Sequence, residues 1–373
     1  MKTKKLGIIC TSPGFGGLEL FTFYLAKALK NKEWQLFFLV NEKSALYEKL
    51  KPEFNVHSIQ QFGKEKNAVR IIKKWNSQIQ CKLLFTPYNK DLKPLSLYKR
   101  FFARNVKLIY QQHMKTGVKK KDFIHRMRYN MLDLWITALP YLKEETLAKT
   151  NVPSEKIKVV PVGLDFKNLH NGKFSKTEAR HQLSLPQDAY LLGVLGRIDP
   201  KKGQDFLIKI LNDLPAEKNI QLLIMGSATA YEGDEWMQHL HELVKQSSLE
   251  NKVHFRPYEK DVALFYSAID LFTMPSHGET YGLVTLEALY FEKPVIGVNT
   301  DGTKALLEDG KLGWLYELEN KNEFKQQLNF ILDNDAAVKE KILLAKRTVL
   351  SNYDFDNTVE RMEELFEIFL SKD

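Results

Sequence analysis

Short apolar runs alternate with segments of helical spacing twice along the chain of 373 residues. This alternation predicts an α/β protein in which parallel strands are joined by helices. In the first half, the expected strands cover residues 6–11, 34–40, 83–86, 107–111, 134–139 and 157–160. In the second half, they cover residues 190–196, 220–225, 253–255, 271–274 and 294–298.

The length and one polar stretch suggest how the chain is divided. A chain of 373 residues exceeds what one hydrophobic core usually fills, so two domains are expected. Residues 161–184 are polar and contain Gly163 and Gly172, which is typical of a linker. Residues 355–370 carry apolar side chains at helical spacing and predict an amphipathic helix.

The composition is that of a folded globular protein, with 44% hydrophobic and 27% charged residues. Two cysteines, Cys10 and Cys81, are too few for a disulfide framework or a metal cluster, and each lies in an apolar run. The apolar run at 6–10 is too short for a signal peptide, and no uncharged stretch is long enough to cross a bilayer. A cytoplasmic protein is therefore expected.

Charge is shared unevenly between the two halves. Residues 1–165 hold 31 Lys and Arg against 13 Asp and Glu, whereas residues 166–373 hold 24 against 33. Such a basic half indicates an anionic partner, which could be a membrane leaflet, a phosphorylated substrate or nucleic acid. One dense segment with interleaved aromatic residues is a candidate membrane or acceptor contact, and equally a solvated surface: Lys119, Lys120, Lys121, Arg126 and Arg128.

The segment 275–287 is the most informative part of the chain. It follows an apolar strand and places Glu279 in a loop and Glu287 on the next helix. Gly282 allows a close approach to the backbone, and the first-turn amides of Leu283 and Val284 offer an anion site. Carboxylates that accept hydrogen bonds from hydroxyls, beside an anion site, suit a nucleotide sugar.

A second group of candidate residues follows the strand at 190–196. Arg197 and Lys202 come a few residues apart, and together they predict a clamp for a diphosphate. Alone, each could be an ordinary surface charge. Tyr258 follows the strand at 253–255 and could stack on a base or simply pack against the protein.

Two candidate features lie at strand ends of the first half. Gly16 and Gly17 stand in a glycine turn that feeds a helix, which suits a phosphate. Glu19 occupies the place of the third glycine of a dinucleotide-binding turn, so a nicotinamide cofactor is disfavoured. His113 follows the strand at 107–111, where a structural and a functional role are both open.

The order of these motifs along nearly the whole chain resembles family 4 of the retaining glycosyltransferases. The motifs are Gly16-Gly17, His113, the segment 160–165, Gly196-Arg197, Lys202-Gly203, Pro275-Ser276, the two glutamates and Pro294-Val295. The resemblance implies a GT-B fold, in which two Rossmann-like, doubly wound parallel-sheet domains face each other across a cleft. Residues 1–165, completed by the last helix at 355–373, would form an acceptor-side domain, and residues 166–354 would bind the nucleotide sugar.

The resemblance also implies roles for single residues. Arg197 and Lys202 would neutralise the donor diphosphate, Glu287 would bind the ribose, and Glu279 and His113 would act at the reacting sugar. Neither a metal ion nor a cofactor would be needed. The remaining donor contacts would come from Gly16, Gly17, Tyr258, Gly282, Leu283 and Val284.

The function that the resemblance implies is a retaining hexosyltransferase that uses a UDP-sugar rather than a GDP-sugar. Its acceptor would be a glycan or glycolipid of lipopolysaccharide, capsule or another surface polysaccharide, reached at the inner leaflet of the membrane. A sugar-nucleotide epimerase of the same fold is an alternative. A nucleic-acid-binding protein is another, although the scattered lysines lack an aromatic-rich RNA motif. The donor sugar, the acceptor and the oligomeric state stay open.

Overall fold

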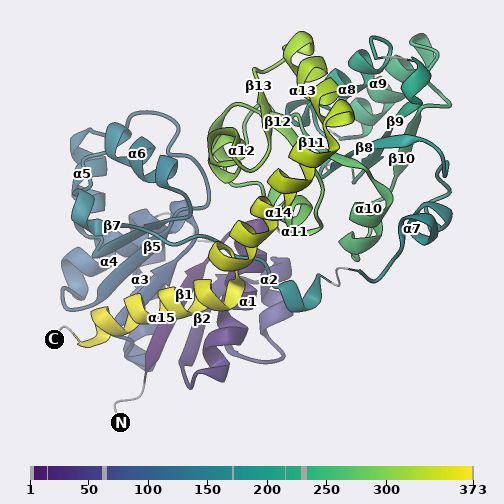
Figure 1. Cartoon of the computed structure of the whole chain (residues 1–373). Coiled ribbons are helices and arrows are strands. Elements are labelled where there is room, and N and C mark those ends of the chain that lie inside the picture. Colours follow the sequence, from purple (N-terminus) through teal and green to yellow (C-terminus); the bar gives the residue numbers. More distant parts are fainter. Residues whose placement is uncertain are drawn as a thin grey trace. The chain divides into compact units, whose positions relative to one another are not determined.

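The computed structural model describes residues 4–14, 16–60, 65–169, 172–214, 216–227 and 233–371, and these form two compact units (Figure 1). The N-terminal unit comprises residues 1–162 and 356–373, and the C-terminal unit comprises residues 163–355. The boundary inferred from the sequence lay nearby, at residues 165 and 354.

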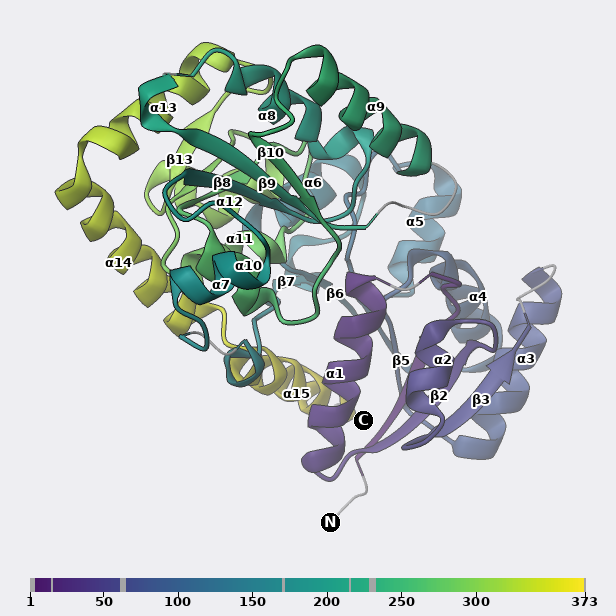
Figure 2. The ribbon, with the colours of Figure 1, turned by 90° about the vertical axis from the view of Figure 1, so that its right-hand side faces the viewer.

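The N-terminal unit contains a seven-stranded parallel sheet in the order β3-β2-β1-β4-β5-β6-β7. The central strands are apolar and almost fully buried because helices cover both faces. Helices α3 and α4 pack side by side in this unit (Figure 2). The strands are β1 Lys5–Cys10, β2 Gln35–Asn41, β3 Asn55–Ile59, β4 Leu83–Thr86, β5 Lys107–Gln111, β6 Leu134–Thr137 and β7 Ile157–Val159. The helices are α1 Gly17–Asn31, α2 Ala45–Leu50, α3 Glu65–Ile79, α4 Leu92–Phe102, α5 Phe123–Asn130 and α6 Pro140–Lys149.

The predicted terminal helix is confirmed as α15, Phe355–Ser371. Its apolar face packs on the N-terminal unit, where the Phe366 ring lies 5.6 Å from Phe85 and 5.9 Å from Trp34. Its polar face is fixed as well, because Trp34 Nε1 donates to Glu363 Oε1 at 3.0 Å.

The C-terminal unit contains a six-stranded parallel sheet in the order β10-β9-β8-β11-β12-β13. Its strands are β8 Tyr190–Leu195, β9 Ile220–Met225, β10 Val253–Arg256, β11 Leu271–Met274, β12 Val295–Val298 and β13 Trp314–Tyr316. Its helices are α7 Lys176–Gln182, α8 Gln204–Leu211, α9 Gly233–Gln246, α10 Val262–Ala268, α11 Leu283–Tyr290, α12 Asp301–Leu306, α13 Lys321–Asp333 and α14 Asp335–Asn352.

All eleven strands expected from the sequence are present, and two further strands escaped the prediction. β3 is an edge strand with alternating partly exposed positions, and β13 has only three residues, so neither shows a long apolar run. Residues 161–184 were predicted to be a linker, and this prediction is wrong for residues 176–182, which form helix α7. The polar Arg180 hid this helix because it is fully buried and binds Asp270 at 2.7 Å.

Both sheets share one topology, in which the first strand of the unit lies between the second and the fourth. In such a sheet, the chain leaves the two central strands in opposite directions, and ligands bind at the carboxyl ends of those strands. This point falls between β1 and β4 in the N-terminal unit, and between β8 and β11 in the C-terminal unit.

Candidate functional site

The loops that follow β8 and β11 are joined to each other in the C-terminal unit. The amide of His277 donates to the carbonyl oxygen of Lys201 at 2.9 Å. Gly203 has a positive φ of 69°, and a Cβ at this position would lie 2.3 Å from the carbonyl oxygen of Pro275. The close approach of these two loops therefore requires a glycine, and it brings their side chains together.

The two loops contribute a cation and a carboxylate that are in direct contact. Lys202 Nζ donates to Glu279 Oε2 at 2.7 Å, and both side chains are about one fifth exposed. An ammonium group has three N–H donors, so this ion pair leaves donors that could reach a phosphate. Arg197 follows the carboxyl end of β8, and its side chain is exposed. Its carbonyl oxygen accepts a hydrogen bond from the side chain of Gln204.

The start of α11 lies next to this ion pair. Gly282 is the N-cap residue of the helix, with a positive φ of 88°, and as a glycine it has no side chain that could cap the first turn. A Cβ at Gly282 would approach Glu279 Cγ to 2.9 Å, so the glycine keeps the carboxylate beside the helix start. The amides of Leu283 and Val284 belong to the first turn, where helix geometry gives them no partner within the helix and where an anion binds well.

Glu287 lies one turn further along α11 and is held by a tyrosine. Tyr266, which is fully buried, is within 2.9 Å of Glu287 Oε2 and within 2.9 Å of the carbonyl oxygen of Val284. Burial raises the pKa of Glu287 to about 7, and the hydrogen bond from Tyr266 partly opposes this shift. Sequence analysis missed Tyr266 because an aromatic residue in an apolar helix is usually part of the core.

Gly302 at the start of α12 fixes the loop that carries Glu279. Its amide donates to the carbonyl oxygen of Glu279 at 2.8 Å. A Cβ here would lie 2.7 Å from the carbonyl oxygens of both Glu279 and Tyr281. The sequence offered one signal for this role, which was a glycine at a strand-to-helix junction of the same sheet.

Tyr258 belongs to a different loop from those that follow β8 and β11. It follows β10, which is the edge strand and is separated from β8 by β9, and its side chain is 52% exposed. The neighbouring Arg256 has a structural role, because its guanidinium donates to the carbonyl oxygens of Leu183 and Ser184 at 2.6 and 2.8 Å. A contact between Tyr258 and a base stays a prediction.

Gly16 and Gly17 follow β1 as expected, but a carboxylate occupies the turn. The amide of Gly16 donates to Glu19 Oε2 at 2.7 Å, and Glu19 is buried. An anion at this amide would have to displace Glu19, whose charge already benefits from the start of α1. The phosphate contact of these glycines therefore stays a prediction.

His113 lies at the carboxyl end of β5, packed against Phe21 with a ring separation of 5.5 Å. Burial lowers the pKa of His113 to about 4, so the imidazole is neutral at pH 7. Its Nε2 is buried and has no hydrogen-bond partner among the residues that the structure describes. A neutral imidazole with an unused ring nitrogen is compatible with a role toward a hydroxyl.

The basic segment of the N-terminal unit separates into two groups. The side chains of Lys119, Lys121 and Arg126 are exposed, whereas those of Lys120 and Arg128 are partly buried and line a cavity. Phe123, at the first position of α5, is 78% exposed. The surface group and the cavity group can therefore serve different ligands.

Across the described parts of the chain, no group of three or more His, Cys, Asp or Glu side chains is placed to hold a metal ion. None of the helices described there is both long and apolar enough to span a bilayer. Cys10 and Cys81 are buried free thiols, and burial raises the pKa of Cys81 to about 12.

Comparison with known proteins finds relatives of the C-terminal half of the chain. Residues 175–348, which include both glutamates, Arg197 and Lys202, match the family described as glycosyl transferases group 1. This segment is therefore similar to glycosyl transferases group 1. A curated relative, the D-inositol 3-phosphate glycosyltransferase of Corynebacterium urealyticum, is 30% identical over 220 residues, which are 57% of this chain and 51% of the relative. The match thus spans about half the length of the curated relatives.

Solved structures extend the likeness to the fold of the whole chain. A glycosyltransferase from Rickettsia africae superposes with a TM-score of 0.88, covers 100% of both chains and is 18% identical. Anabaena HepE in complex with UDP gives a TM-score of 0.83 at 21% identity, and the match covers 98% of this chain and 99% of HepE. The expected GT-B fold, with two Rossmann-like domains, is confirmed.

Proposed function

We propose that the chain is a retaining hexosyltransferase that transfers a hexose or hexosamine from a UDP-sugar, rather than a GDP-sugar, to a glycan or glycolipid acceptor. Its products would belong to lipopolysaccharide, capsule or another cell-surface polysaccharide. The observation that carries the proposal is the contact between Lys202 and Glu279 beside the start of α11, where the N-cap residue is Gly282. Cationic donors, backbone amides and carboxylates then lie where a diphosphate and a sugar meet.

Each part of the donor is assigned to a neighbouring group. Lys202, Arg197 and the amides of Leu283 and Val284 bind the diphosphate, while Glu279 accepts hydrogen bonds from the sugar hydroxyls. Glu287 accepts hydrogen bonds from the ribose hydroxyls, and the hydrogen bond from Tyr266 holds the Glu287 carboxylate in place. The group 1 match of this segment and the UDP complex of HepE support a nucleotide-sugar donor.

Bond cleavage develops negative charge on the departing diphosphate, and fixed cations and amides lower the barrier by meeting that charge. The bond between the anomeric carbon and the phosphate oxygen breaks, and the acceptor oxygen attacks from the same face. The acceptor proton passes to the departing phosphate oxygen. The proposal assigns charge neutralisation to Arg197 and Lys202, so turnover should persist in EDTA.

The N-terminal unit is proposed to bind the acceptor and to dock on an anionic membrane surface through Lys119, Lys121 and Arg126. Gly16, Gly17 and His113 keep their predicted roles toward the phosphate and the reacting sugar. Support comes from the excess of basic residues in this half and from the exposed Phe123 among them.

A thermal-shift panel of nucleotide sugars, followed by mass spectrometry of the product made with the best donor, tests the proposal. A UDP-sugar should raise the melting temperature, and an acceptor should gain one sugar. Conversion of the free nucleotide sugar without transfer would identify an epimerase instead. Stabilisation by an oligonucleotide alone would identify a nucleic-acid-binding protein.

A further inference from the structure

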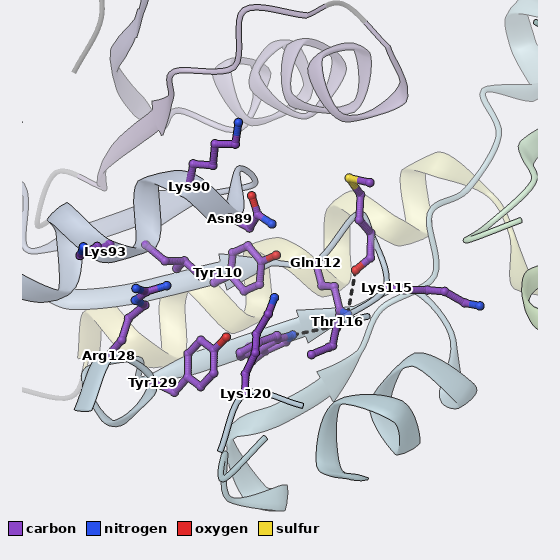
Figure 3. A pocket seen from close by; sticks show the side chains of 13 residues that line it. Asn89, Lys90, Lys93, Tyr110, Gln112, Lys115, Thr116, Lys120, Arg128 and Tyr129 are labelled. Atoms are coloured by element: carbon purple, nitrogen blue, oxygen red, sulfur yellow. Dashed lines mark hydrogen bonds between the residues drawn. The ribbon is translucent and has the colours of Figure 1, made fainter. Parts of the chain in front are cut away.

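A cavity of about 300 Å³ lies wholly inside the N-terminal unit, between the start of α4, the carboxyl end of β5 and helix α5 (Figure 3). Its size is at the lower end of the range of small-molecule sites, which is about 300 to 1,000 Å³. Sequence analysis found two of its cations, Lys120 and Arg128, but assigned them to a membrane or acceptor surface. It lacked the residues that come from other elements, Asn89, Lys90, Lys93 and Tyr110.

The lining has one sign of charge. Lys90, Lys93, Lys115, Lys120 and Arg128 all border the cavity, and no Asp or Glu is among its described lining residues. In Figure 3, Lys120 rises toward the hydroxyl groups of two tyrosines, whereas Lys115 extends away from them. Grouped cations repel one another, and an anion in their midst removes that repulsion.

Arg128 contributes an unused donor to the cavity lining. Its Nε is buried and has no hydrogen-bond partner among the described residues. A buried charged donor without a partner costs free energy, which a ligand oxygen would recover. The planar guanidinium presents its donors in a fork that matches the oxygens of a phosphate.

Aromatic side chains form part of the cavity wall. Tyr110 and Tyr129 both pack edge-on against Trp135, with ring centroids 4.9 and 5.2 Å away. Burial raises the pKa of Tyr129 and of Tyr110, so both hydroxyls stay protonated and can donate to an anion. Apolar walls also lower the local dielectric constant, which strengthens each contact to a charged group.

The floor of the cavity is rigid. Gln112 accepts hydrogen bonds from Trp135 and Thr146, both at 3.0 Å, and donates to the carbonyl oxygen of Met114 at 2.9 Å. A fixed floor holds the surrounding donors in place before a ligand arrives, and this reduces the entropy lost on binding.

We propose that this cavity binds a phosphate group of the acceptor, held by Arg128 and Lys120 with the hydroxyls of Tyr110 and Tyr129. The inference rests on the proposed transferase function, and it assigns the acceptor to the class of phosphorylated sugars, polyols or lipid headgroups. A smaller apolar groove shares Lys93 and Arg128 with the cavity and is bordered by Ile124 and Met127, so the phosphate could be carried by a lipid.

The test is titration of the full chain with glucose 6-phosphate and, separately, with glucose. Glucose 6-phosphate should bind and glucose should not. Arg128→Gln and Lys120→Gln should each weaken binding about tenfold or more, as expected for charge-assisted contacts, and Arg128→Lys should recover part of the loss. Arg104→Gln and Lys158→Gln, which change exposed cations outside the cavity, should bind like the parent.

Vesicles of phosphatidylcholine with and without phosphatidic acid separate the two sources of phosphate. Binding that needs phosphatidic acid and Arg128, without binding of glucose 6-phosphate, would assign the site to a lipid headgroup and support the proposal. Absence of both kinds of binding, or equal losses in the two control variants, would overturn it. Titration with UDP tests the proposed function separately. If the protein binds UDP and Lys202→Ala weakens that binding, the proposed function stands even when the phosphate site fails its own test.

Discussion

The Lys202 ammonium and the Glu279 carboxylate form an ion pair, 2.7 Å from Nζ to Oε2, although 77 positions of sequence separate them. The pair exists because β8 and β11 are neighbours in the sheet and because Gly203 lets their loops touch. It holds a cation and an acceptor of hydrogen bonds in fixed positions before any substrate binds.

Lys202→Ala is expected to raise the dissociation constant of UDP tenfold or more, since a hydrogen bond to a charged group contributes about 1.5 to 3 kcal/mol. Isothermal titration with UDP measures the change. The neighbouring Lys201 is exposed, so Lys201→Ala serves as the matched control and should leave the constant nearly unchanged. Equal effects in the two variants would mean that the contribution is general surface charge.

Glu279→Gln is expected to lower turnover strongly while the affinity for UDP stays equal or improves. The variant replaces the charged acceptor for sugar hydroxyls with a neutral amide, which accepts more weakly, and it releases Lys202 toward the phosphates. Steady-state kinetics with the best donor and titration with UDP measure the two quantities. A parallel loss of UDP affinity would contradict the assignment of Glu279 to the sugar.

The stability of the C-terminal unit should depend on pH through Glu287. Burial raises its pKa from 4.5 to about 7, so the folded state holds the proton more tightly than the unfolded chain does. The stability from this group is fully present below pH 4.5 and is lost as the pH rises through about 7.

Glu287→Gln has no titratable group at this position. The loss of unfolding free energy between low and neutral pH should therefore be smaller by about 1 to 3 kcal/mol in this variant. Urea unfolding at several pH values measures the effect, and the exposed Glu259→Gln is the control. Asp91 in the N-terminal unit, whose pKa burial also raises to about 7, should keep its own contribution in both variants. An unchanged slope in Glu287→Gln would show that Glu287 titrates normally.

Gly203→Ala should destabilise the protein by about 2 to 4 kcal/mol, because the new Cβ meets the Pro275 carbonyl and the backbone has a positive φ. Gly172 also has a positive φ, but a Cβ there has no neighbour within 4 Å. Gly172→Ala should therefore cost only about 1 kcal/mol. Thermal unfolding of the two variants separates crowding from backbone strain, and similar losses would rule out the crowding.

Lys119→Gln combined with Lys121→Gln is expected to weaken binding to anionic vesicles, most strongly at low salt where screening is weakest. Vesicle cosedimentation at two salt concentrations measures this. Lys158→Gln, an exposed lysine on β7, is the control. If both variants bind the vesicles as tightly as the parent protein, the basic segment is an ordinary solvated surface.

The sequence was sufficient to predict eleven of the strands and the two parallel-sheet domains. It also predicted the loops that carry Arg197, Lys202 and Glu279, and the helix that carries Glu287. Long apolar runs bury themselves wherever they pair, so strands such as β8 and β11 are visible without knowledge of their partners. The edge strand β3 escaped because its partly exposed positions leave no long apolar run, and helix α7 escaped because the buried Arg180 is satisfied by Asp270, 90 positions along the chain.

The amino-acid sequence alone determined which residue types stand at the strand ends, because hydrophobic periodicity is a local property. Tertiary structure decided which of them meet. Strand order brought Lys202 to Glu279, placed Tyr258 two strands away from β8, and gathered Lys120 and Arg128 with Tyr110 around one cavity. Contacts of this kind join distant segments through sheet register and helix packing, which no single stretch of sequence encodes.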